Sequence, residues 1–131
     1  MSALMTFERF VPGAALGACT ERVEARALAR WAELYPWDAP LEDEAPAGLA
    51  TVMLLRAYMR VVSPRPPGNV HARQRLELIS PLRCGEAITT AFSCAGRELR
   101  RERRYVEIDA RGTGEDGRDV FTGRMTLIWA A

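Results

Sequence analysis

The sequence predicts one α+β domain in which an antiparallel sheet wraps around a long buried helix. The segment from Pro46 to Met59 is apolar on nearly every side, so we expect it to be buried on most sides. The segments that follow alternate between apolar and polar residues and are joined by short turns, as the strands of a meander are. A sheet that curves around the helix satisfies both observations.

The composition is that of a single domain spanning residues 1–131. Hydrophobic residues make up 48% and charged residues 27%, and the net charge is +1. Nothing overall therefore steers the chain towards nucleic acid or an anionic membrane, and no apolar run reaches the roughly 20 residues of a membrane helix. The three cysteines have no CxxC spacing, which argues against a disulfide framework and a metal site. We expect a cytoplasmic protein without a cofactor.

The first elements are predicted from short patterns. Residues 7–11 are apolar-rich and end at Pro12-Gly13, which predicts a first strand. Thr20 is a plausible N-cap for an amphipathic helix that ends at Pro36. Residues 37–45 form an acidic loop, and Pro46 opens the buried helix at a first-turn position.

Four strands are expected after that helix. In the strand 70–79, one face carries Val70, Ala72, Leu76 and Leu78, and the other carries His71, Arg73, Arg75 and Glu77. Further strands are expected at residues 87–94, 97–111 and 121–129. The turn at 114–117, Gly-Glu-Asp-Gly, is a strong hairpin signal before the last of them.

Three segments together resemble one known family. They are Pro67-Gly68-Asn69-Val70-His71-Ala72, Pro81-Leu82-Arg83-Cys84-Gly85-Glu86 and the closing residues 117–129. In this order after the buried helix they are similar to MaoC-like acyl-thioester dehydratases and hydratases. The resemblance implies the hotdog fold and a substrate that is an acyl-CoA or acyl carrier protein thioester.

Catalytic members of that family carry Asp, then Asn-Pro, an aliphatic residue and His in the loop before the buried helix. Asp38, Pro40 and Leu41 match this pattern, but one residue is missing before Pro40 and Glu42 stands in the place of the histidine. The resemblance is therefore to the halves or subunits that lack the catalytic histidine loop. Asp38 and Glu42 are candidate acid and base groups, and a solvated acidic loop is the alternative.

His71 is the only histidine, and an ordinary pKa of ~6.5 suits an acid or a base. It resembles the histidine of hotdog halves whose catalytic loop has been lost, where it lies near the acyl tunnel or the dimer seam. A structural histidine is the alternative. The residues beside these candidates are expected to bind substrate: Tyr35, Gly68, Asn69 and Val70.

Arginines 97, 100, 101, 103 and 104 form the one basic run, in which Glu98 and Glu102 are interleaved. The run is either a solvated outer sheet face or a contact for coenzyme A phosphates or an acidic carrier-protein helix.

Two functions remain open. One is an acyl-thioester hydratase or dehydratase, with a thioesterase as the alternative enzyme. The other is a non-catalytic hotdog subunit, in a homodimer or in a heterodimer whose partner supplies the Asp and His. Glu42 favours the second, and the exposed edge of a single curved sheet favours a dimer.

Overall fold

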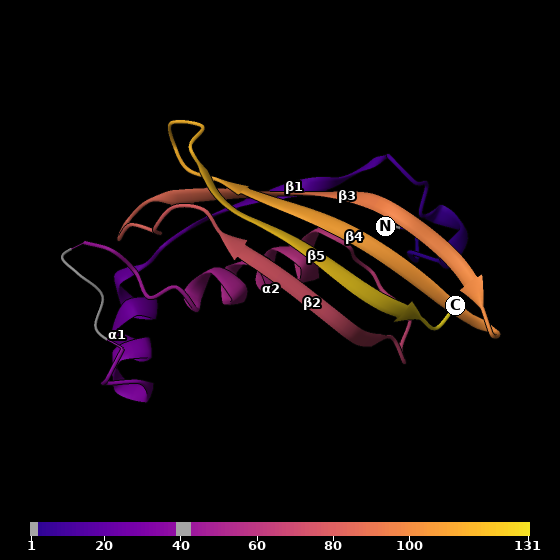
Figure 1. Ribbon diagram of the computed structural model, residues 1–131, viewed down its shortest axis with the longest axis horizontal. Coiled ribbons are helices and arrows are strands. Elements are labelled where there is room, and N and C mark those ends of the chain that lie inside the picture. Colours follow the sequence, from indigo (N-terminus) through magenta and orange to yellow (C-terminus); the bar gives the residue numbers. More distant parts are fainter. Residues whose placement is uncertain (1–2, 39–42) are drawn as a thin grey trace.

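The computed structural model describes residues 3–38 and 43–131. Within these residues the chain forms a five-stranded antiparallel sheet of order β1-β3-β4-β5-β2, together with two α-helices and a short 3₁₀ turn (Figure 1). The elements are η1 (Phe7–Arg9), β1 (Ala15–Arg22), α1 (Ala25–Leu34), α2 (Leu49–Val61), β2 (Val70–Leu78), β3 (Ala87–Arg100), β4 (Arg103–Thr113) and β5 (Asp119–Trp129).

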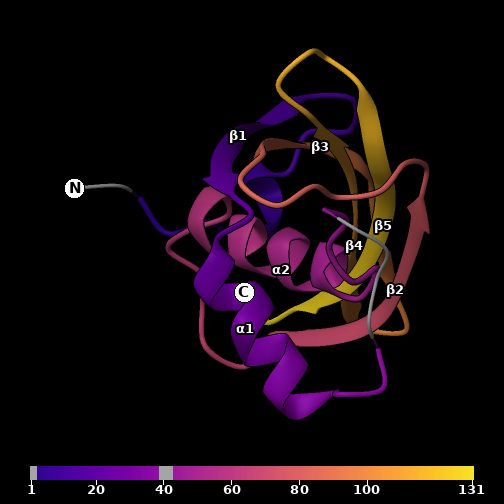
Figure 2. The ribbon, with the colours of Figure 1, turned by 90° about the vertical axis from the view of Figure 1, so that its left-hand side faces the viewer.

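The sheet curves around α2, as Figure 2 shows. Alternate residues of β3, β4 and β5 face the helix and form the core with it, among them Phe92, Ile108 and Met125, each at most 2% exposed. The core extends to Phe10, whose ring meets Trp129 edge to face at 4.8 Å between centroids. The predicted α+β arrangement of a sheet wrapped around a helix is therefore confirmed.

The N-terminal elements differ from the prediction. Residues 7–9 form a 3₁₀ turn, and the first strand is β1, which pairs with β3. Thr20 lies inside that strand, where its hydroxyl contacts that of Thr89 at 2.8 Å, and α1 begins only at Ala25. Pairing with β3 overrides the local helical spacing, because cross-strand contacts outweigh intrinsic preference over such short segments.

Helix α2 is exposed along one stripe only. It begins at Leu49, three residues after Pro46, and its buried residues are Leu49, Ala50, Met53, Leu54, Ala57 and Tyr58. Val52 is 39% exposed and Met59 is 54% exposed. Arg56 and Arg60 share this stripe, and Leu55 and Val61 pack against the core as partly buried residues. The prediction that the sheet buries most sides of this helix is therefore confirmed, and its exposed stripe mixes apolar and cationic side chains.

A β-bulge reverses the predicted faces at the start of β2, at Val70 and His71, and leaves those of residues 73–78 as predicted. His71 pairs with Leu127 of β5, whereas Arg73 pairs with Thr126, so Ala72 is the extra residue. Directly paired residues lie on the same face of a sheet, and Leu127 belongs to the core. His71 therefore lies on the concave face, and the prediction that it shares a face with Arg73 and Arg75 is wrong.

The hairpin between β3 and β4 also differs from the prediction. Strand β3 passes through Ala95-Gly96 with a bulge and continues to Arg100, so residues 97–100 do not open the next strand. The turn consists of Arg101 and Glu102, whose φ angles are 52° and 64°. Both values are positive, as in the tight turns that match the twist of a hairpin.

Candidate functional site

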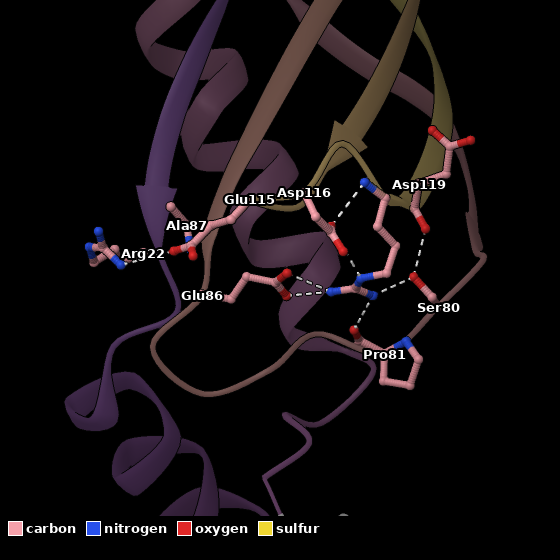
Figure 3. Close-up of polar contacts among 9 residues, drawn as sticks. Arg22, Ser80, Pro81, Glu86, Ala87, Glu115, Asp116 and Asp119 are labelled. Carbon is pink, nitrogen blue, oxygen red and sulfur yellow. Dashed lines mark hydrogen bonds and ion pairs between the residues drawn. The ribbon is translucent and has the colours of Figure 1, made fainter.

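The guanidinium group of Arg118 joins the loops at one end of the sheet by binding residues in and next to the segment Pro81 to Glu86 (Figure 3). Arg118 Nη2 donates to both carboxylate oxygens of Glu86 at 2.5 and 2.6 Å, and its Nη1 donates to Ser80 Oγ at 2.6 Å and to the Pro81 carbonyl at 3.0 Å. The side chains of Arg118 and Glu86 are 22% and 12% exposed. This two-point pair fastens the β4–β5 turn to the segment before β3.

The same segment holds the loop that precedes α2. The amide of Ala45 donates to the Leu82 carbonyl at 2.7 Å, and the amide of Cys84 donates to the Asp43 carbonyl at 2.9 Å. The amide of Val23 donates to the Glu86 carbonyl at 2.9 Å. The end of β1 and the approach to α2 are thus fixed to one turn, which sets where α1 emerges.

A cleft of about 580 Å³ lies between α1 and the first half of α2. Arginines and apolar side chains share its walls. Its lining residues are Glu24, Arg26, Ala27, Arg30, Trp31, Leu34, Tyr35, Leu49, Val52 and Arg56. No described residue of α1 is buried, so the apolar side of this helix faces the cleft without filling it.

Three aromatic rings stand at the outer end of this cleft. The ring of Tyr35 lies 4.7 Å from that of Trp31 and 5.8 Å from that of Trp37. Trp31 packs so closely on Gly48 that a Cβ atom there would lie 2.5 Å from the indole ring. The indole therefore lies against the residue before α2, and only glycine permits this approach.

Asp38 is attached to the same cluster. The indole Nε1 of Trp31 donates a hydrogen bond to Asp38 Oδ2 at 2.9 Å. The Asp38 carboxylate is thus placed at the end of α1, on the exposed side of the aromatic rings. Glu42, the other predicted acid or base in this loop, lies outside the described residues.

An ion pair holds Arg56 at the α2 wall of the cleft. Arg56 Nη2 lies 2.5 Å from Glu21 Oε1, and the Glu21 side chain is only 15% exposed. Glu21 Oε2 is buried without a hydrogen bond among the described residues, and Arg60 Nη1 lies 3.9 Å from it. A small cavity of about 40 Å³ lies beside Glu21. It shares the lining residues Glu24, Leu49 and Arg56 with the larger cleft.

The remaining predicted residues lie together elsewhere. Gly68 has a φ of 95°, which favours glycine, and it leads into Asn69, whose Oδ1 accepts a hydrogen bond from the amide of Ala130 at 2.8 Å. Val70 and His71 follow at the start of β2, and both are exposed. These four residues therefore lie beside the C-terminal end of β5.

The predicted site residues thus form two groups. Tyr35 and Asp38 lie at α1, at one end of the long axis, and β2 begins at the other end, beside the C-terminus (Figure 1). The fold of one chain does not bring Asp38 and His71 together.

Sequence reasoning missed the cleft arginines. Arg26 and Arg30 are four residues apart on α1, so they share a helix face, but their approach to Arg56 depends on how α1 and α2 pack. The only signal in the sequence was that spacing.

A second hollow, of about 360 Å³, lies over β2, β4 and β5 and is lined by Arg75, Glu77, Asp109 and Arg124 among others. Arg124 already forms a two-point pair with Asp109 at 2.7 and 3.0 Å. We interpret this hollow as part of a charged, solvated sheet face. Among residues 3–38 and 43–131 no group of three metal-binding side chains occurs, and no helix there is long and apolar enough to cross a membrane.

No protein-family model and no curated protein sequence matches the chain. Solved structures do match. A MaoC-like dehydratase from Rhodospirillum rubrum is 17% identical, with a TM-score of 0.82 over 97% of this chain and 98% of that one. The HadBC (3R-hydroxyacyl-ACP dehydratase) complex from Mycobacterium tuberculosis contains a chain that is 17% identical, with a TM-score of 0.70 over 90% of this chain and 96% of that one.

A thioesterase from Thermus thermophilus, solved with coenzyme A and zinc, is 14% identical, with a TM-score of 0.66 over 90% of this chain and 86% of that one. At these identities the likeness establishes architecture. The predicted resemblance is therefore confirmed at the level of the fold: this chain has the hotdog fold of the MaoC-like dehydratases and hydratases.

Proposed function

We propose that this protein binds acyl thioesters of coenzyme A or acyl carrier protein and is a hotdog subunit related to 2-enoyl and 3-hydroxyacyl thioester hydratases. The observation that carries the proposal is the cleft between α1 and α2, on a fold whose solved examples include dehydratases and thioesterases. Its volume of about 580 Å³ lies within the range of ligand pockets, and its mixture of arginine, aromatic and aliphatic side chains suits an apolar acyl chain on an anionic carrier.

We further propose that one chain alone is not a hydratase. Adding water to a 2-enoyl thioester needs a group that takes a proton from water and another that gives a proton to the α-carbon. Asp38 and His71 lie at opposite ends of the molecule, and one Asp38 oxygen already accepts the indole hydrogen bond. A partner subunit would have to complete the pair.

The surface suited to that partner is the edge of β2 together with the uncovered side of α2. Among the residues that the structure describes, strand β2 pairs only with β5, so its other edge carries backbone groups that no described strand pairs with. Exposed apolar side chains lie on both elements and just after β2: Met59, Val70, Leu78 and Ile79. A second hotdog subunit, identical or different, covers these residues in our proposal. Light scattering should give a mass well above the 14.6 kDa of one chain.

A thioesterase is the second candidate, because Glu21 places a carboxylate oxygen without a hydrogen bond beside a cavity large enough for one water. In that reaction Glu21 takes a proton from the water as the water oxygen attacks the thioester carbonyl. The C–S bond then breaks, and the protonated Glu21 gives this proton to the thiolate sulfur. Hydrolysis of octanoyl-CoA that is lost in Glu21→Gln would favour this candidate.

The three cysteines are free, and we place the protein in the reducing cytoplasm.

The proposed function is tested by calorimetric titration with octanoyl-CoA. Leu34 is 55% exposed and lines the cleft, whereas Leu99 is 67% exposed and lies at the far end of β3. Leu34→Glu places a charge where the acyl chain would lie and should weaken binding at least tenfold. Leu99→Glu is the matched control and should bind like the unaltered protein. Equal binding by the two variants would place the acyl thioester outside the cleft.

A further inference from the structure

We propose that Arg26, Arg30 and Arg56 form a phosphate clamp across the cleft, which binds the phosphate of the phosphopantetheine carrier and orients the acyl chain towards the apolar side chains of the cleft. This inference rests on the proposed function and identifies the phosphate as the part of the ligand that the three arginines bind. The clamp is defined as these three arginines.

The clamp spans two helices. Arg26 and Arg30 line the cleft from α1, and Arg56 lines it from α2 on the other side. A planar guanidinium presents several N–H donors to phosphate oxygens, and donors on two sides suit a tetrahedral anion that accepts from many directions. Three arginines against Glu24 among the lining residues also give the cleft an excess of positive charge.

The arginines of α1 have little to bind within the described chain. Arg26 forms one ion pair, with Glu24 at 3.6 Å, and both side chains are largely exposed, which makes that pair weak. No ion pair joins Arg30 to the residues that the structure describes. Both side chains can therefore turn to a ligand without giving up a strong contact.

Arg56 is held in place differently. Its Nη2 lies 2.5 Å from Glu21 Oε1, while 54% of the Arg56 side chain stays exposed. A single carboxylate contact leaves other N–H donors of the guanidinium available. Glu21 is thus a positioning residue that fixes Arg56 at the wall of the cleft.

The apolar lining sets the direction of the ligand. Ala27, Trp31 and Leu34 line the cleft from α1, and Leu49 lines it from α2. An acyl chain gains free energy by leaving water for these side chains, and a phosphate loses free energy if it is buried without partners. The phosphate therefore stays at the arginines, and the acyl chain lies against the apolar side chains of the cleft.

Ligand binding should also order α1. This helix has no fully buried residue and is held on the body of the protein by the partly buried Ala27, Leu28 and Trp31. A phosphate bound by Arg30 and Arg56 at the same time would connect α1 to α2. Amide hydrogen exchange in residues 25–34 should slow when octanoyl-CoA is added.

The test uses three octanoyl thioesters titrated into the full chain. Octanoyl-CoA and octanoyl acyl carrier protein both carry phosphopantetheine, whereas octanoyl-N-acetylcysteamine carries no phosphate. The clamp variant is Arg26→Gln with Arg30→Gln. The control is Arg9→Gln with Arg73→Gln, which removes two exposed positive charges that do not line the cleft.

The clamp variant should bind octanoyl-CoA about 10- to 100-fold more weakly than the control, since charged hydrogen bonds to phosphate are lost. Both variants should bind octanoyl-N-acetylcysteamine equally. The carrier-protein arm distinguishes the source: a loss confined to octanoyl-CoA assigns the clamp to coenzyme A, and a loss confined to the carrier protein assigns it to that partner.

Equal octanoyl-CoA and carrier-protein affinities in the clamp variant and the control would overturn the clamp and leave the proposed function standing. If no thioester binds the unaltered protein, the proposed function fails and the clamp fails with it. Circular dichroism of both variants checks that α1 is still formed.

Discussion

Trp31 holds Asp38 at the end of α1 through an indole hydrogen bond of 2.9 Å. Trp31→Phe keeps an aromatic ring against Gly48 but removes the donor. We expect a loss of about 1 kcal/mol in the free energy of unfolding, measured by urea denaturation. Trp37→Phe is the matched control, because Trp37 is 78% exposed. A loss of the same size in Trp37→Phe would show that the hydrogen bond does not hold this loop.

The Glu86–Arg118 pair should matter more to stability than the pairs on the outer sheet face. Glu86→Gln leaves the partly buried Arg118 guanidinium without its carboxylate, and we expect a cost of about 2–3 kcal/mol. Asp109→Asn removes a carboxylate from an exposed pair with Arg124 and should cost less than about 1 kcal/mol. Guanidinium denaturation of the two variants checks the order, and the reverse order would contradict it.

Leu54 lies at the centre of the core and is 0% exposed. Leu54→Asp should prevent folding, since a buried unpaired carboxylate costs several kcal/mol against a typical stability of about 5–15. Val52→Asp changes the same helix on its uncovered side and should leave a folded chain by circular dichroism. Met59→Asp lies on the proposed subunit interface and should lower the mass found by light scattering. Equal folding of Leu54→Asp and Val52→Asp would place α2 on the surface.

Burial raises the pKa of Tyr58 to about 12, although Arg65 nearby acts in the opposite direction. The ordinary value is 10.0, so the folded state favours the neutral phenol. The resulting stability is fully present below pH 10 and is lost as the pH rises from about 10 to about 12. Tyr58→Phe should remove this loss in denaturation series at rising pH. An unchanged pH dependence would refute this assignment.

The same substitution tests the phenol at neutral pH. The Tyr58 hydroxyl is buried without a hydrogen-bond partner among the described residues. Removing it should leave the stability unchanged or raise it by about 1 kcal/mol.

The sequence predicted the meander well because its strands alternate and are closed by clear turns. Glu115 and Asp116 form the tip of a hairpin that is flanked by two glycines, and the strands on either side have the expected faces. The hairpin at Arg101 and Glu102 carries no glycine, so its left-handed turn had no signal. Strand β1 was missed because its pairing with β3 is a long-range contact.

The site was harder to predict than the fold. A one-residue bulge at Ala72 moves His71 to the other face of the sheet, and alternation counted along the sequence cannot register it. The resemblance placed Asp38 and His71 in one candidate site, but their separation depends on where α1 and β2 begin in space. The cleft depends on the packing of α1 beside α2, which the amphipathic pattern of each helix does not specify.

The central claim is that one chain binds an acyl thioester without an acid–base pair of its own. It is tested most directly by following hydration of crotonyl-CoA and octenoyl-CoA with the purified protein at concentrations that saturate the binding site. We expect a rate at the level of the reaction without protein, since loss of one proton-transfer group typically removes about 10²- to 10⁴-fold. Robust turnover that Asp38→Asn or His71→Ala abolishes would contradict the claim.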